Sequence, residues 1–196
     1  GTLGIDYNIG SKKNSLTTPE SEEIVSALNE LYVKKVKHII IEASSHGLAQ
    51  YRLDGVNFNI IAITSLSRDH LDYHKTFKAY KVAKLRLFSE VSNQGIAIIN
   101  KCVPDYKDFI EVAKSNNLKV ITIGSSVSAN WKYKINNINN GIQEIEVIFN
   151  KVKTKVYSNL IGSFQINNLI TAISIMVEMG FRREKIEKLI SKLKAP

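Results

Sequence analysis

The sequence predicts an α/β protein with three layers, in which helices cover both faces of a mostly parallel sheet, plus a small antiparallel addition. Two observations support this fold class. Up to residue 124, short β-branched runs alternate with longer amphipathic segments, which is the pattern of strand and helix units around a parallel sheet. After residue 130, three closely spaced strand-like runs follow one another, and two helical segments come last.

The strands are predicted from short apolar runs. Runs of the kind found in strands covered on both faces occur at 38–41, 59–64, 95–100 and 119–124. The antiparallel strands are expected at 131–135, 143–149 and 153–158, and Asn139-Asn140-Gly141 is typical of a hairpin turn. Residues 43–55 are expected to be rich in loops.

The helices are predicted from apolar spacing and end signals. Thr18 is a candidate cap for the first helix, Pro19 fits its first position, and the acidic residues that follow complement the helix dipole. Apolar residues then recur at helical spacing up to Tyr32. Further helices are expected at 75–88, 105–116, 165–179 and 183–193. Gly180 stands where a helix would end.

Composition narrows the function classes. The 196 residues carry a net charge of +9, but the lysines are spread along the chain without an arginine-rich block or an aromatic-interleaved basic stripe. This favours a solvated surface and a phosphate-bearing substrate over nucleic acid. Cys102 is the only cysteine, which fits a reducing compartment. No apolar run approaches the about 20 residues of a membrane span, so we expect a cytoplasmic protein without a membrane partner.

Polar residues follow two of the expected strands. Glu42, Ser44, Ser45 and His46 come directly after the run at 38–41, at the carboxyl end where open parallel sheets bind ligands. A metal or phosphate site and a capped turn are both consistent with this stretch.

The second polar stretch, residues 64–74, follows the run at 59–64. Asp69, His70, Asp72 and His74 lie within it, and a carboxylate-rich loop beside a phosphate suits magnesium. A polar surface loop is the alternative.

Lys84 interrupts an apolar helical stripe. Phe77, Tyr80, Lys84 and Phe88 share one face of the expected helix through spacings of three and four. A partly buried lysine loses its charge more readily, and the neutral amine is its reactive form. The alternative is a lysine whose amine reaches solvent.

Residues 161–168 open the penultimate helix, where Asn167 and Asn168 could read a base edge or serve as turn residues.

These stretches occur together and in this order, and on them the chain resembles the Mur ligase family, in particular the members that form the tripeptide precursor of peptidoglycan. Residues 44–52 resemble the family's SSHGLxxxR signature, and residues 66–74 match LSRDHLDYH. Residues 83–88 match AKxxLF, residues 162–168 resemble GxFNxxN, and residues 1–4 and 17–19 also match. The resemblance covers nearly the whole chain.

The resemblance implies roles for individual residues. The Mg²⁺ ligands would be Glu42, His70 and Lys84, with the lysine carrying a carbamate as a bidentate oxygen ligand. Substrate contacts would be Thr17, Thr18, Ser44, Gln50 and Arg52, and Arg52 suits phosphate or carboxylate oxygens. Asn168 would approach the adenine of ATP.

The implied reaction is an ATP-dependent amide ligation in cell-wall synthesis. ATP phosphorylates the terminal carboxylate of UDP-N-acetylmuramoyl-L-alanyl-D-glutamate, and the amine of meso-diaminopimelate or L-lysine attacks the acyl phosphate. The protein mainly positions the reactants, while magnesium neutralises charge.

The sequence departs from the family pattern in several places. Ser65 and Gln165 stand where the family has asparagine, and no Gly-x-x-x-x-Gly-Lys-Ser/Thr phosphate loop is present. We therefore expect residues 1–194 to be the central domain without its phosphate-loop strand, which would leave sheet edge and core exposed. Residues 195–196 would begin a linker, and the family's N- and C-terminal domains would be missing. We expect this piece to be inactive by itself.

Two other functions remain open at this point. One is a ligase like folylpolyglutamate synthase, although its substrate motifs differ from residues 44–52 and 66–74. The other is a non-catalytic remnant, or a partner that works only with separately encoded pieces.

Overall fold

The computed structural model describes residues 5–6, 11–12, 16–67, 69–190 and 192–193. Residues 1–4, Arg68 and residues 195–196, on which parts of the expected signatures and linker fall, lie outside them. The chain divides into two compact units. The first comprises Gly1–Phe58 and Arg68–Ser92, and the second comprises Asn59–Ser67 and Asn93–Pro196.

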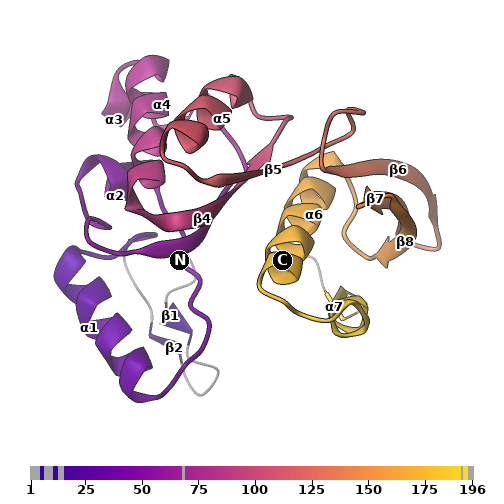
Figure 1. Cartoon of the computed structure of the whole chain (residues 1–196), viewed down its shortest axis with the longest axis horizontal. Helices are drawn as coiled ribbons and strands as arrows, with labels where there is room; N and C mark the ends of the chain where they lie inside the picture. The colour runs from indigo at the N-terminus through magenta and orange to yellow at the C-terminus, as the bar shows by residue number, and fades with distance from the viewer. Residues whose placement is uncertain (1–4, 7–10, 13–15, 68, 191, 194–196) are drawn as a thin grey trace. The chain divides into compact units, whose positions relative to one another are not determined.

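The second unit contains a six-stranded sheet (Figure 1). Its strands lie in the order β3 (Phe58–Ile63), β4 (Val91–Asn100), β5 (Lys119–Gly124), β6 (Trp131–Asn139), β7 (Ile142–Phe149) and β8 (Val152–Ser158). β5 pairs in parallel with β4 and β6, and β7 pairs antiparallel with β6 and β8. The α/β class and the antiparallel addition are therefore confirmed.

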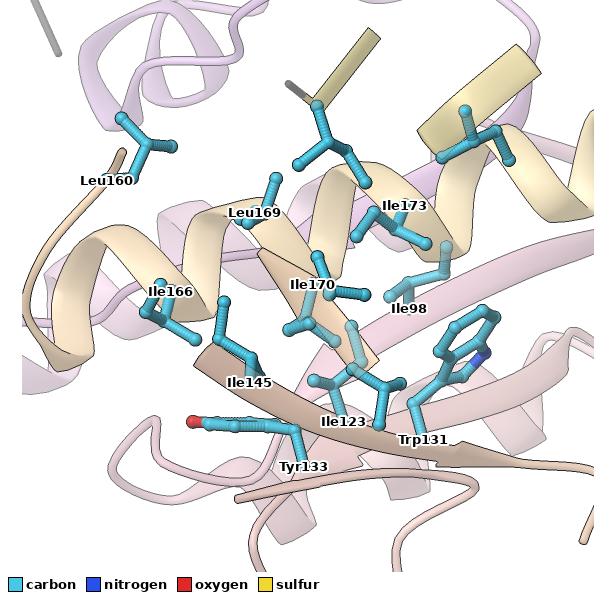
Figure 2. Close-up of a cluster of buried hydrophobic side chains, with 14 of the residues drawn as sticks. Ile98, Ile123, Trp131, Tyr133, Ile145, Leu160, Ile166, Leu169, Ile170 and Ile173 are labelled. Atoms are coloured by element: carbon cyan, nitrogen blue, oxygen red, sulfur yellow. The ribbon is translucent and has the colours of Figure 1, made fainter. Parts of the chain in front are cut away.

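Three helices belong to this unit: α5 (Tyr106–Ser115), α6 (Ser163–Glu178) and α7 (Arg183–Ile190). One apolar face of α6, which includes Ile166 and Ile170, points toward Ile123 and Ile145 on the strands (Figure 2). All four side chains are fully buried, and Trp131 stacks on Phe149 nearby. Burial of this cluster, at roughly 25 cal/mol per Å² of apolar surface, is a main source of the unit's stability.

The expected turn and helix end in this unit are confirmed. Asn140 and Gly141 both have positive φ, at 50° and 75°, as a two-residue turn between antiparallel strands requires. Gly180 has φ 81° directly after α6, a conformation that glycine adopts at low cost at a helix end.

The first unit is mainly helical (Figure 1). It holds α1 (Ser21–Val33), α2 (Ser45–Ala49), α3 (Leu71–His74), α4 (Phe77–Leu85) and the 3₁₀ helix η1 (Arg86–Glu90), with a short antiparallel pair, β1 (Ile5–Asp6) and β2 (Ser11–Lys12). The single helix expected at 75–88 is thus two consecutive helices, and the stretch 43–55 contains α2 as well as loop.

Two expectations for this unit are wrong. Residues 38–41 form no strand, and Ile40 is 87% exposed. A β-branched run becomes a strand only where a neighbour satisfies its backbone hydrogen bonds, and none of the described strands pairs with it. Thr18 does not cap α1 either: the cap position is Glu20, because the Thr18 hydroxyl is used elsewhere.

Within the described residues, every helix is too short or too polar to cross a membrane.

Candidate functional site

Thr18 joins the chain before α1 to the polar stretch that follows residue 41. Its Oγ1 donates a hydrogen bond to the carbonyl oxygen of Glu42 at 2.7 Å and accepts one from the amide of Ser44 at 2.9 Å. The residue is fully buried. A buried hydroxyl with both bonds satisfied holds the backbone on either side of Ala43, directly after Glu42, in one conformation.

The short helix α2 is fixed from several sides. Ser44 Oγ caps it by accepting a hydrogen bond from the Gly47 amide at 3.1 Å. Arg86 donates from Nε to the carbonyl oxygen of Leu48 at 3.2 Å and forms an ion pair with Asp54 at 3.0 Å. A Cβ atom at Gly47 would lie 2.8 Å from the Thr18 side chain, so only glycine allows this close approach.

Arg52 lies against two of the other predicted substrate contacts, Thr18 and Gln50. Its Nη1 donates to the carbonyl oxygen of Thr18 at 2.8 Å, and its Nη2 bonds to Gln50 and lies 3.0 Å from a Glu20 carboxylate oxygen. Gln50 in turn donates to the Tyr73 hydroxyl at 3.0 Å. Arg52 Nε is buried and has no hydrogen-bond partner among the described residues, so one guanidinium N–H can still take an acceptor.

His70 has a left-handed backbone conformation, with φ 57°. Its amide donates to Asp69 Oδ1 at 2.9 Å. Its ring lies edge-on to His46, with centroids 4.9 Å apart, and its centroid is 6.2 Å from that of Tyr80. The side chain is 48% exposed, so the imidazole is accessible to a ligand.

Lys84 is half-buried on α4, one turn after the buried residue Tyr80, and the buried residue Phe88 follows on η1. The part of the expected apolar stripe that lies on α4 is therefore confirmed, whereas Phe88 belongs to the next helix. Burial lowers the pKa of the Lys84 amine, while the negative charges of Asp69 and Glu42 act in the opposite direction. Its Nζ lies 5.3 Å from the centroid of the Tyr80 ring, which His70 also contacts.

The predicted metal ligands therefore lie in one neighbourhood of the first unit. Among the described residues, no three of His, Cys, Asp and Glu form a group that could hold a metal ion. The predicted set contains only two residues of these types, Glu42 and His70, so a third protein ligand would have to come from Lys84. Its lowered pKa favours the neutral amine, the form that combines with carbon dioxide.

Sequence reasoning missed the aromatic and imidazole cluster beside His70. The cluster consists of His46, Tyr73, His74 and Tyr80, which contact one another or His70 through their rings. Three of these residues, His46, Tyr73 and His74, belong to the signatures at residues 44–52 and 66–74. Tyr80 lies on the same helix face as Lys84. Spacing alone did not show that a histidine of one signature would contact a histidine of the other.

His74 is the most buried member of this cluster. It is 8% exposed, and its Nε2 has no hydrogen-bond partner among the described residues. Burial lowers the pKa of His74, and the imidazoles of His46 and His70 lower it further. These surroundings therefore favour the neutral form of His74.

Two of the predicted contact residues, Thr17 and Asn168, are half-buried. Thr17 precedes the Thr18 anchor. Asn168 lies on α6 in the second unit. Its neighbour Asn167 accepts a hydrogen bond from the Tyr133 hydroxyl. Burial, with the nearby Cys102 thiol, raises the pKa of Tyr133 to about 12, so that hydroxyl keeps its proton.

A family model and several relatives match this chain. The family model of the Mur ligase middle domain matches residues 1–176. The UDP-N-acetylmuramoyl-L-alanyl-D-glutamate--2,6-diaminopimelate ligase of Rickettsia typhi is 35% identical to this chain over 99% of its length. The ligase of the same name from Zymomonas mobilis is 36% identical over 92% of the chain. The chain spans about 40% of the length of these relatives.

Solved structures extend the similarity. A structure of a ligase with that name covers the whole chain with a TM-score of 0.89 and 28% identity, and the chain covers 40% of it. MurF from Acinetobacter baumannii covers 70% of the chain with a TM-score of 0.62 at 16% identity. Folylpolyglutamate synthetase from Lactobacillus casei gives 0.54 at 9% identity, also over 70% of the chain. The last two likenesses concern the fold alone.

Proposed function

The chain belongs to the Mur ligase family, as its middle domain, and from this premise we propose that it is the central part of an ATP-dependent amide ligase. The ligase would join the terminal carboxylate of UDP-N-acetylmuramoyl-L-alanyl-D-glutamate to an amine of 2,6-diaminopimelate in peptidoglycan synthesis. The names of the relatives from Rickettsia typhi and Zymomonas mobilis support this choice of carboxylate and amine over L-lysine. They also favour it over folate polyglutamylation.

The observation that carries the proposal is the environment of Lys84. The Lys84 amine lies on an apolar helix face. Burial lowers its pKa, whereas the negative charges of Asp69 and Glu42 raise it. For a purely structural lysine this position is costly, because burial penalises the charged form. For a lysine that reacts with carbon dioxide it is favourable, because the neutral amine is the reactive species.

In this proposal Glu42, His70 and the Lys84 carbamate would hold Mg²⁺. The ion would supply charge neutralisation where phosphate oxygens and the reacting carboxylate meet. The chain's own contribution is orientation. The Thr18 hydroxyl fixes the backbone at Glu42, and that hydroxyl is already saturated, so its substrate role would be indirect.

The substrate contacts would come from Thr17, Ser44, Gln50 and Arg52. Arg52 is held by Thr18 and Gln50, so its guanidinium is oriented before a ligand arrives, which reduces the entropy lost on binding. Its guanidinium would donate to an anionic oxygen of the substrate. Asn168 would contact the adenine of ATP.

The metal site can be tested on the 196-residue chain itself. Mn²⁺ would be titrated into the protein in bicarbonate buffer by calorimetry, with the variants Glu42→Gln and Lys84→Met. Lys78→Met is the matched control, because Lys78 is an exposed lysine on the same helix, α4. We expect one saturable site that both site variants lose and the control keeps. A site retained in Lys84→Met would refute the assignment.

The reaction can be tested in a chimera. Residues 1–196 would replace the matching segment of the Rickettsia typhi ligase, and ADP release would be measured with the UDP-dipeptide and diaminopimelate. We expect turnover that Lys84→Met removes and Lys78→Met preserves. A folded chimera that binds Mn²⁺ but remains inactive would favour the non-catalytic remnant.

A further inference from the structure

We propose that His46 is a positioning residue, which holds the imidazole of His70 in the orientation required for metal binding. This inference rests on the proposed function, because it takes His70 as a metal ligand. The family resemblance implied no individual role for His46. The residue lies on α2, and its ring contacts His70 and Tyr73 within the first unit of the chain.

The orientation of His70 needs an explanation. A histidine that binds a metal usually donates its other ring N–H to a carboxylate or carbonyl group, which fixes the ring. Here a carboxylate oxygen of Asp69 lies 4.0 Å from His70 Nε2, which is beyond hydrogen-bond distance. The Asp69 carboxylate instead accepts the backbone amide of His70. The Asp69 carboxylate therefore does not fix this ring by a hydrogen bond.

Ring packing provides the orientation instead. The rings of His46 and His70 lie at 82° to each other with centroids 4.9 Å apart, an edge-to-face arrangement. Tyr80 contacts the His70 ring as well, at a centroid distance of 6.2 Å. Because the His70 side chain is about half exposed, loss of the His46 contact would free its ring to adopt other rotamers.

His46 is itself held firmly. It lies on α2, which Ser44 caps and Arg86 fastens through the Leu48 carbonyl oxygen. The ring of His46 also packs against Tyr73 at 4.2 Å and His74 at 5.5 Å between centroids. Because the His46 ring is supported in this way, it restricts the movement of the His70 ring. Such packing keeps the geometry of metal ligands within narrow limits at a binding site.

The contact also connects the two parts of the proposed site. His46 follows Glu42 by four residues, whereas His70 precedes the short helix α3. The ring pair is therefore a direct contact between the two stretches that would each supply one metal ligand. Removing it would separate the two ligands without removing either.

The test compares His46→Ala and His46→Phe in the 196-residue chain, with Mn²⁺ affinity measured in bicarbonate buffer. We expect His46→Ala to weaken Mn²⁺ binding about 10-fold, as for other residues that orient metal ligands. His46→Phe restores a ring in that place, so we expect most of the affinity to return. Thermal unfolding without metal separates this effect from a general loss of stability.

A second measurement does not depend on a variant. Nuclear Overhauser effects between the imidazole protons of His46 and His70 in the wild-type chain should be observed, and their absence would overturn the inference. Unchanged Mn²⁺ affinity in folded His46→Ala, beside normal binding by the wild type, would also overturn it and leave the proposed function intact. Absence of Mn²⁺ binding in the wild type would instead refute the metal site and the inference together.

Discussion

The side chain of Thr18 and the backbone of Glu42 are joined by a 2.7 Å hydrogen bond, which is completed by the amide of Ser44 donating to the same hydroxyl. Thr18 comes from the segment before α1, whereas Glu42 lies 24 residues later. This bond connects a residue expected to contact substrate with the backbone of one expected to bind metal. We therefore expect loss of this bond to lower both the free energy of unfolding and the affinity for the metal.

Thr18→Val should destabilise the chain, because it keeps the side-chain shape while removing the partner of two partly buried groups, the carbonyl of Glu42 and the amide of Ser44. We expect a loss of about 2 kcal/mol in the free energy of unfolding, measured with urea. Mn²⁺ affinity should fall as well, because the Glu42 backbone is released. Thr18→Ser keeps the hydroxyl and serves as the control. Equal stability of the valine and serine variants would contradict the role assigned to this bond.

Gly47→Ala should be destabilising through a steric clash. The new Cβ would lie 2.8 Å from both Cβ and Cγ2 of Thr18, closer than packed atoms tolerate. We expect a cost of about 1–3 kcal/mol, as for other overpacked sites. Thr18→Ser removes Cγ2 and should recover part of the loss in the double variant. Strict additivity of the two substitutions would argue against direct contact.

Lys84→Met should stabilise the metal-free chain at neutral pH when carbon dioxide is excluded. Because the folded-state pKa of Lys84 is lowered, its favourable contribution is present above the ordinary lysine pKa and is lost as the pH falls. The variant should therefore be more stable than the wild type near pH 7, with a higher Tm, and this gain should shrink as the pH approaches 10. Lys78→Met should show no such dependence. A stability gain that grows with pH would contradict this assignment.

Tyr133 should titrate later than the other tyrosines. Absorbance of the phenolate during alkaline titration should reveal one group with a pKa of about 12 that is missing in Tyr133→Phe. Because the folded-state pKa is raised, the contribution of this group to stability is complete below about pH 10 and is lost as the pH rises toward 12. A tyrosine set that titrates as one population would contradict the burial of this hydroxyl.

Much of the fold was predictable from local patterns. The strand at 119–124 and the turn at Asn140-Gly141 depend on short-range signals, namely β-branched runs and residues that tolerate positive φ, and both are confirmed. The stripe containing Lys84 was predictable for the same reason, since helical spacing alone brings Tyr80 and Lys84 to one face.

Other features depend on distant contacts and were not predictable. Residues 38–41 have the composition of a buried strand, but composition does not specify whether a neighbouring strand is present. Threonine is a residue type that often caps helices, yet the Thr18 hydroxyl bonds to a segment more than 20 residues away. The pairing of His46 with His70 likewise depends on where α2 and α3 meet, which neither signature encodes by itself.

The central claim is that Lys84 captures carbon dioxide and becomes a metal ligand beside Glu42 and His70. Carbon-13 NMR of the chain in labelled bicarbonate tests this most directly, because a lysine carbamate gives a carbonyl resonance distinct from bicarbonate. We expect a carbamate signal that Mg²⁺ strengthens, that Lys84→Met removes and that Lys78→Met retains. A signal that persists in Lys84→Met, or no carbamate signal in the wild-type chain with or without Mg²⁺, would contradict it.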